Sequence, residues 1–182
     1  MSRIAVISDT HMVPGRVRAL PAACLERLRA AELIVHAGDW SSMETLGLVR
    51  GLGPPVVGVR GNVDDRAVRA ALPATAEAQA GGVAIGVVHD GGPGGGRLSR
   101  LRRRFPRADV VVFGHSHIPL HEVADDGFRI INPGSPTDRR RSARHSMAEI
   151  EVAAGRVVAV TFWAVDDPPG PLEDDLVRGA PG

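Results

Sequence analysis

The chain has no tyrosine, a single cysteine and few other aromatic residues. Its 182 residues include two Trp and four Phe, so aromatic residues make up only 3% of the total. A surface that reads nucleic-acid bases by stacking needs aromatic side chains, and a nucleic-acid partner is therefore not indicated. Cys24 cannot form a disulfide within the chain, and its position in an apolar stretch predicts a buried small side chain.

Long apolar runs and a strong charge bias are absent as well. No run approaches the roughly 20 apolar residues that a membrane-spanning helix needs, so no membrane association is expected. The chain starts with a strand pattern instead of a signal peptide. The net charge is only +1, which indicates no general attraction to polyanions. These features predict a cytoplasmic protein and leave homo-oligomerisation open.

What the sequence does contain is a regular alternation of strand and helix patterns, which changes after residue 113. Helices are expected at residues 21–30, 43–50, 64–71 and 97–105. Two antiparallel hairpins follow, at residues 120–131 and 147–165. This order favours an α/β domain of residues 1–165, with two sheets packed face to face and helices outside. Residues 166–182 are rich in Pro, Gly and acidic residues, which predicts a mobile C-terminal tail.

Potential metal ligands follow five of the predicted strands. The segments are Asp9-Thr10-His11, Gly38-Asp39, Gly61-Asn62, His89 and Gly114-His115-Ser116-His117. Ligands of open α/β sheets bind beyond the carboxyl ends of the strands, so these side chains are expected at one edge. Each segment alone is common in structural loops. Together they have the chemistry of a two-metal hydrolytic site.

With this ordered set of motifs, the chain resembles the calcineurin-like metallophosphoesterases, most closely the small YfcE-like phosphodiesterase branch. The resemblance covers roughly residues 4–139 and includes Asn132-Pro133-Gly134-Ser135. It implies a four-layer α/β/β/α sandwich of two mixed sheets. That architecture agrees with the one predicted from the strand and helix patterns.

The resemblance also implies two divalent transition-metal ions, with Mn as the first choice and Fe, Zn, Co or Ni also suited to imidazole and carboxylate ligands. The ligands of the first ion would be Asp9, His11 and His117. The ligands of the second would be Asn62, His89 and His115, and Asp39 would bridge the two. A metal-bridging hydroxide would attack phosphorus, with Asn62 and His115 close enough to assist.

One departure from the family pattern concerns the substrate. Members that cleave monoesters well often have His after the Gly-Asn pair, whereas this chain has Val63, which cannot protonate a leaving group. The expected activity is therefore hydrolysis of a small phosphodiester. The alternatives are a phosphomonoesterase or nuclease on the same site, or a binding scaffold resembling the retromer subunit of this fold, with little catalysis.

Several further residues are candidates for support of the site or for substrate binding. They are His36, which would orient Asp39 or pack beneath it; Asp90, which replaces a glycine of the family; Ser135; and Arg139. The glycine-rich segment 91–96 is expected to form a flexible rim, and the arginines of 97–107 a solvated helix face or an anion-steering surface. His121 and His145 lie in no motif and are expected at the surface.

Overall fold

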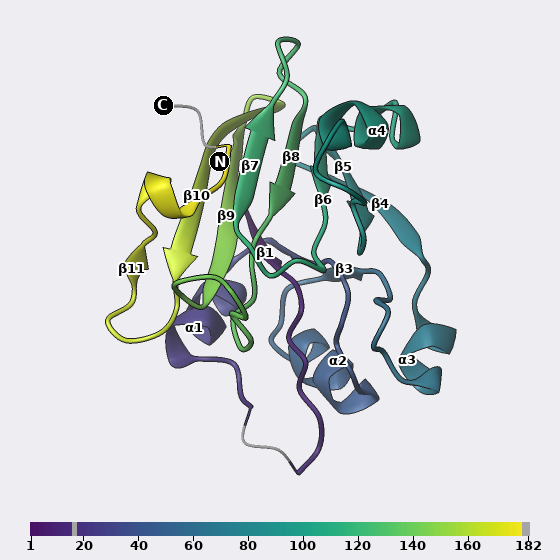
Figure 1. The fold of residues 1–182 in the computed structure, drawn as a ribbon, viewed down its shortest axis with the longest axis vertical. Coiled ribbons are helices and arrows are strands. Elements are labelled where there is room, and N and C mark those ends of the chain that lie inside the picture. The colour runs from purple at the N-terminus through teal and green to yellow at the C-terminus, as the bar shows by residue number, and fades with distance from the viewer. Residues whose placement is uncertain (16–17, 180–182) are drawn as a thin grey trace.

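The computed structural model of the protein describes residues 1–15 and 18–179, which form two β-sheets packed face to face (Figure 1). The first sheet has six strands in the order β11-β10-β9-β1-β2-β3. They are β1 (Ser2–Ile7), β2 (Leu33–His36), β3 (Val56–Gly58), β9 (Ser146–Ala153), β10 (Arg156–Ala164) and β11 (Gly170–Pro171). The pairs β1–β2 and β2–β3 are parallel and the other pairs are antiparallel, so this sheet is mixed.

The second sheet has five strands in the order β4-β5-β6-β8-β7. They are β4 (Thr75–Ala80), β5 (Val83–Val88), β6 (Val110–Val112), β7 (Leu120–Val123) and β8 (Arg129–Asn132). The three central strands β5, β6 and β8 run parallel, with an antiparallel strand at each edge. The carboxyl ends of both parallel sets therefore become available for loops that carry ligands.

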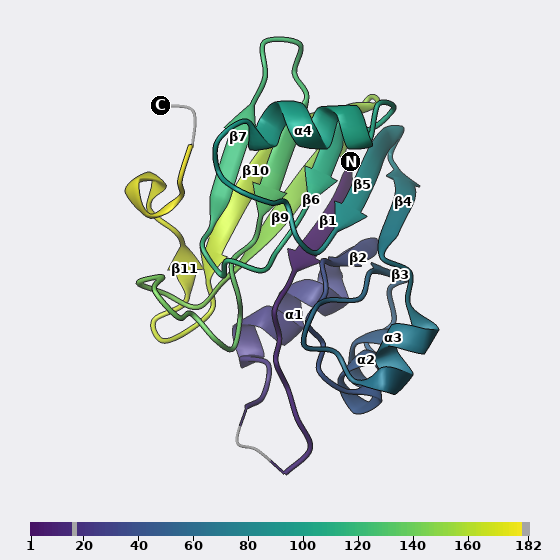
Figure 2. The same cartoon turned by 45° about the vertical axis from the view of Figure 1, so that its right-hand side comes forward.

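Helices cover the outer faces of both sheets (Figure 2). Helices α1 (Ala22–Ala30), α2 (Met43–Arg50) and α3 (Arg66–Ala71) pack on the first sheet, and α4 (Arg97–Arg104) lies across the second. These layers confirm the predicted α/β/β/α sandwich of two mixed sheets. Among the described residues, no helix combines the length and apolar content that crossing a bilayer requires.

Strand β1 shows why the strands are apolar throughout instead of alternating with polar residues. Ile4 and Val6 face the core between the sheets, whereas Ala5 and Ile7 face the helices. Because both faces of the strand are covered, each position favours an apolar side chain. Cys24 lies fully buried in the helix-covered layer, and burial raises the pKa of its thiol to about 12, which confirms the predicted small buried side chain.

Two side chains set where the helices near the predicted site begin. Ser42 Oγ accepts a hydrogen bond from the Thr45 N–H at 3.3 Å, so Ser42 caps α2. Asp65 caps α3 by accepting from the Val68 N–H at 2.8 Å. Helix α3 therefore begins two residues later than predicted, and the preceding residue Asp64 is free to bond elsewhere.

The prediction of a mobile tail is wrong for residues 166–179. Strand β11 pairs with β10, and Leu172 and Val177 are buried in the core between the sheets. Asp166 accepts from Arg144 Nε at 2.7 Å. The apolar residues in this segment are few, but they cover one end of the core, which composition alone did not indicate. Residues 180–182 lie outside the described residues.

His121 is buried instead of exposed, which corrects the prediction of a surface position. Its side chain packs near Phe162, and its Nε2 has no hydrogen-bond partner within residues 1–15 and 18–179. Burial lowers the pKa of His121 to about 4, with a smaller contribution from Arg129. The folded protein therefore keeps this imidazole neutral at pH values where the unfolded chain would bind a proton.

We expect stability to fall as the pH drops from about 6.5 towards 4, because only the unfolded chain takes up the His121 proton in that interval. The loss attributable to this residue is at most about 3 kcal/mol. Denaturant unfolding at pH 7 and pH 4.5, compared between wild type and His121→Leu, measures it. The variant should lose less stability on acidification, and an equal loss in both proteins would contradict this account.

Candidate metal centre

The predicted ligands come from loops at the carboxyl ends of five parallel strands, three in the first sheet and two in the second. Asp9 and His11 follow β1, Asp39 follows β2, Asn62 follows β3, His89 follows β5, and His115 and His117 follow β6. The carboxyl ends of the parallel strands of both sheets lie near the middle of the molecule (Figure 1). The structure thus brings together all seven residues that the sequence analysis proposed as ligands.

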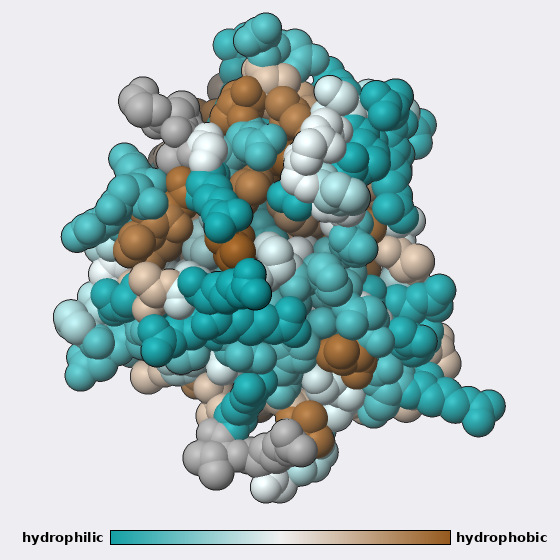
Figure 3. Space-filling model, in the orientation of Figure 1, coloured by the Kyte–Doolittle hydropathy of each residue, from teal (hydrophilic) through white to brown (hydrophobic). Residues whose placement is uncertain are grey.

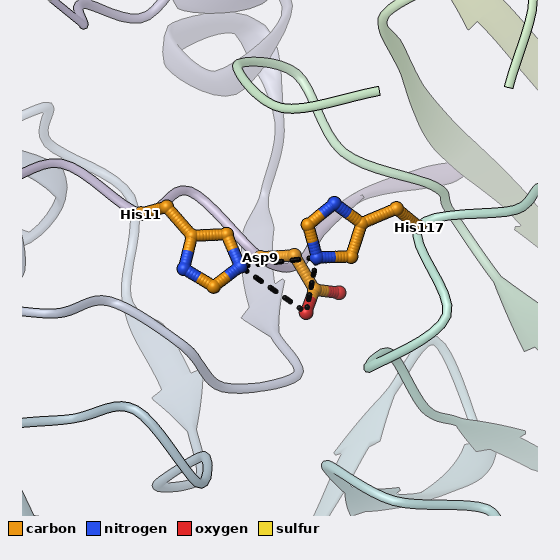
Figure 4. A group of neighbouring side chains, drawn as sticks. All are labelled: Asp9, His11 and His117. Atoms are coloured by element: carbon orange, nitrogen blue, oxygen red, sulfur yellow. Dashed lines mark hydrogen bonds and ion pairs between the residues drawn. The ribbon is translucent and has the colours of Figure 1, made fainter. Parts of the chain in front are cut away.

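The first group consists of Asp9, His11 and His117, whose rings point at the Asp9 carboxylate (Figure 4). Nε2 of His11 and Nε2 of His117 lie 3.0 Å apart. They lie 3.9 Å and 3.3 Å, respectively, from Asp9 Oδ1. His117 Nδ1 donates to the Asp138 carbonyl, which leaves Nε2 as the nitrogen with a free lone pair. Three ligand atoms therefore converge on one point.

The second group centres on His89 and Asp39. His89 Nε2 lies 3.3 Å from Asp39 Oδ2 and 2.9 Å from Asn62 Oδ1. The same Asn62 oxygen lies 2.9 Å from His115 Nδ1. Asp9 also lies within ligand range of Asp39 and His89, so Asp9 belongs to both groups of ligand atoms. Asp39 Oδ2 lies 3.7 Å from His11 Nε2 and thus stands between the groups.

The chemistry of these atoms fits a cation. His89 Nδ1 donates to the Ala37 carbonyl at 2.8 Å, so in a neutral ring Nε2 is a lone pair that faces two oxygen acceptors. Only a proton or a metal ion relieves the resulting repulsion. Burial alone would lower the pKa of His89, but Asp39 and Asp9 raise it above its usual value. The site therefore attracts positive charge at this nitrogen.

The Asp39 carboxylate is held in its charged form. Burial works against the charge, but the hydrogen bond and charge of His89 together with the Val63 N–H outweigh it and lower the pKa of Asp39 to about 2. The Val63 N–H donates to Oδ1 at 3.0 Å. That bond fixes the carboxylate with Oδ2 facing His11 and His89.

The backbone at the site is strained. Five of the proposed ligands have positive φ angles: Asp9, His11, Asp39, His115 and His117, at 56°, 43°, 60°, 71° and 59°. Residues other than glycine rarely adopt this conformation, and it concentrates at functional sites. Gly114, which precedes His115, is required for lack of space. A Cβ on Gly114 would lie 1.9 Å from Ser8 Oγ and 2.6 Å from Asp9 Oδ2.

Replacing Gly114 with Ala is expected to weaken metal binding, because the added methyl group must displace the Asp9 carboxylate. Overpacking of this kind costs about 1–3 kcal/mol, so the apparent metal affinity should fall about tenfold or more. Metal titration followed by calorimetry measures the change. Gly94→Ala is the matched control, since a Cβ there meets nothing within 4 Å. Equal metal affinity in the two variants would contradict the packing argument.

His36 and Ser135 support the site without reaching into it. His36 is fully buried, stacks on Trp40 and bonds to Thr10 Oγ1 at 3.1 Å, so it packs beneath the Asp39 loop. Burial lowers the pKa of His36 well below its usual value. Ser135 Oγ donates to the Asp9 carbonyl at 2.7 Å. Both residues fix main-chain positions of ligand loops, and neither is placed to touch a substrate.

Asp90 and Arg139 bond within their own loops, and loop capping was one of the roles left open for Asp90. Asp90 is exposed and accepts from the Gly92 N–H at 2.7 Å, which caps the glycine-rich loop. Arg139 Nη1 donates to the Ala143 carbonyl at 2.7 Å, which holds it within its own loop. The glycine-rich loop is itself held by Arg100, which donates to the carbonyls of Gly91 and Pro93.

Sequence reasoning missed two residues that position ligands. The Asp64 carboxylate accepts from the N–H groups of Gly61 at 2.6 Å and Ser41 at 2.7 Å, which ties the Asn62 loop to the Asp39 loop. Asn132 Nδ2 donates to the Gly114 carbonyl at 2.9 Å. Its place in the Asn-Pro-Gly-Ser segment was a signal, whereas Asp64 resembled an ordinary helix-capping residue.

Comparison with known proteins identifies the family. The model of the calcineurin-like phosphoesterase superfamily domain matches residues 2–155. A probable metallophosphoesterase of Methanocaldococcus jannaschii is 36% identical over 137 residues, which are 74% of this chain and 68% of that protein. A probable metallophosphoesterase of Methanothermobacter thermautotrophicus is 36% identical over 136 residues, which are 74% of this chain and 77% of that protein.

A solved structure supports the same fold. Wild-type Vps29 from Entamoeba histolytica, complexed with zinc, superimposes with a TM-score of 0.74 over 93% of this chain and 97% of that chain. The sequence identity is 24%, so this likeness concerns the fold alone. The extent of the family match and the identity to the two archaeal proteins decide the assignment. The chain belongs to the calcineurin-like phosphoesterase superfamily.

Proposed function

We propose that this metallophosphoesterase is a dinuclear, metal-dependent phosphodiesterase that acts on a small phosphoester in the cytoplasm. The observation that carries the proposal is the place of Asp39 Oδ2, 3.7 Å from His11 Nε2 and 3.3 Å from His89 Nε2. One carboxylate oxygen therefore faces both groups of ligand atoms. A carboxylate is the ligand best suited to bridge two cations, because it brings a negative charge to both.

Under this proposal, each ligand group holds one ion. The first would be held by Asp9, His11 and His117, the second by Asn62, His89 and His115, and both by Asp39. When bound, the two ions would supply a hydroxide nucleophile near neutral pH and would neutralise charge on the phosphoryl oxygens. The mixture of imidazole and carboxylate favours Mn, Fe, Zn, Co or Ni, and Mn is our first choice.

The chain's own residues orient the substrate and limit the leaving group. Asn62 and His115 are both exposed and contact each other, and under this proposal they would contact a phosphoryl oxygen. Val63 follows Asn62, and its side chain is 44% exposed. Because valine has no proton to give, a substrate whose leaving group needs no protonation is favoured, and an activated diester meets that requirement.

Two alternatives use the same fold. A phosphomonoesterase or a nuclease would share the metal ligands and would differ in the substrate that binds beside them. A binding scaffold needs no metal chemistry, and Vps29 from Entamoeba histolytica shares the fold. Ligand completeness favours catalysis here, since every proposed position carries a side chain that can bind a metal.

The test is an activity panel on metal-stripped protein to which Mn, Fe, Zn, Co or Ni is added back singly. The substrates are bis(p-nitrophenyl) phosphate, p-nitrophenyl phosphate and a cyclic nucleotide. We expect the diester to be cleaved fastest and only after metal is restored. Faster cleavage of the monoester would favour the first alternative, and metal binding without turnover of any ester would favour the scaffold.

A further inference from the structure

The arginine loop that follows the Asn-Pro-Gly-Ser segment reaches the metal centre through one residue, Arg140. Its Nη1 donates to the carbonyl of His115 at 3.3 Å. Two residues earlier, Asp138 accepts from Nδ1 of His117 through its main-chain carbonyl. The loop therefore touches both histidines that follow β6, one proposed for each ion.

Arg140 differs from Arg18, Arg139 and Arg144 in what its guanidinium contacts. Arg18 pairs with Asp138 at 3.1 Å, and Arg144 pairs with Asp166 at 2.7 Å. Arg139 is held by the Ala143 carbonyl. Arg140, by contrast, is exposed, and within residues 1–15 and 18–179 its one hydrogen bond is to the His115 carbonyl and no carboxylate pairs with it. Most of its N–H donors are therefore available to an incoming anion.

The backbone conformation of Arg140 indicates a role other than that of a solvated surface residue. Its φ angle is 46°, in the left-handed region that a residue with a Cβ adopts at a cost. Strain of this kind persists where the surrounding structure requires it, and it is concentrated at functional sites. Here the strained residue stands beside ligand residues His115 and His117, which also have positive φ angles of 71° and 59°.

Hydrophilic side chains cover the middle of this face of the molecule, below β7 and β8, where the loops of the metal centre meet (Figure 3). A polar surface suits a phosphoryl group better than an apolar substrate. Guanidinium groups bind phosphoryl oxygens through two parallel hydrogen bonds, which a lysine cannot reproduce.

We propose that Arg140 is the substrate-positioning residue of this enzyme and that its guanidinium clamps non-bridging oxygens of the phosphoryl group held at the metal centre. This inference rests on the proposed function and goes further, since it assigns the clamp to Arg140 and not to its neighbour Arg139. The role is ground-state binding and orientation. No proton moves and no bond forms or breaks at this residue.

The experiment measures binding of inorganic phosphate to metal-reconstituted full-length protein by calorimetry, alongside KM and kcat for the diester. Arg140→Gln should weaken phosphate binding and raise KM by about tenfold or more, with a smaller change in kcat and unchanged metal content. Arg140→Lys should recover part of the loss, because the charge returns without the fork. Arg141→Gln removes an exposed neighbouring charge and should behave as wild type.

Equal phosphate affinity in wild type and Arg140→Gln would overturn the inference while leaving the proposed hydrolase untouched, since turnover is measured separately. A loss of metal content or of thermal stability in Arg140→Gln would also overturn it. In that case Arg140 would act on the His115 main chain as a structural residue. If Arg141→Gln weakened phosphate binding as much as Arg140→Gln does, the effect would come from general positive charge, and the inference would be overturned.

Discussion

Replacing Asp39 with Asn is expected to lower kcat/KM for the diester by at least about 10³-fold, the largest loss of any single substitution considered. Loss of one preorganised charge-stabilising group commonly costs about 10²–10³-fold, and Asp39 Oδ2 serves two ligand groups at once. The carboxylate is charged at all working pH values, because its pKa is about 2. The amide has the same shape and lacks that charge, so both ions should bind more weakly.

Metal content measured on the same samples separates the explanation from a folding defect. Asp39→Asn should unfold cooperatively near the wild-type temperature and retain less metal. Asp125→Asn is the matched control, since that carboxylate lies exposed in the turn between β7 and β8. If Asp39→Asn retained wild-type turnover with two ions bound, the bridging role would be wrong.

The second large effect concerns leaving-group protonation at position 63. We expect Val63→His to raise kcat/KM for p-nitrophenyl phosphate and for alkyl monoesters, most strongly where the leaving group is poor. General acid catalysis is worth typically about 10²–10⁴-fold when the donor is well placed. The side chain is 44% exposed, so an imidazole has room, and the Val63 N–H to Asp39 hydrogen bond does not depend on the side chain.

The comparison includes Val63→Phe, which fills similar space without a proton donor. Only the histidine variant should gain monoester activity, and its gain should decline at pH values above the pKa of the new imidazole. Diester turnover should change little in either variant. A wild-type preference for the monoester, or an equal gain in the phenylalanine variant, would mean that another group supplies the proton or that shape decides the substrate.

Much of this fold was predictable because its elements carry local signals. The bounds of α2 were predicted as the structure has them, since it is a short amphipathic run between polar residues. The two sheets packed face to face followed from the change of pattern after residue 113. The tail was mispredicted because burial of Leu172 and Val177 depends on where the chain turns after β10, and composition does not report that.

The convergence of the proposed ligands was predictable for a related reason. Carboxyl ends of parallel strands meet, so residues directly after those strands meet as well. Residues that act through long-range contacts gave no comparable signal. Arg139 and Arg140 are indistinguishable in sequence, and only the path of the loop places Arg140 on the His115 carbonyl. His121 was mispredicted because its burial depends on Phe162, forty-one residues later, and on the final segment.

The central claim is that one carboxylate, Asp39, joins two metal positions. Elemental analysis of the wild-type protein, reconstituted with Mn and dialysed free of excess metal, tests it most directly. The account predicts two ions per chain. A stoichiometry of one ion, or of none after reconstitution, would contradict it.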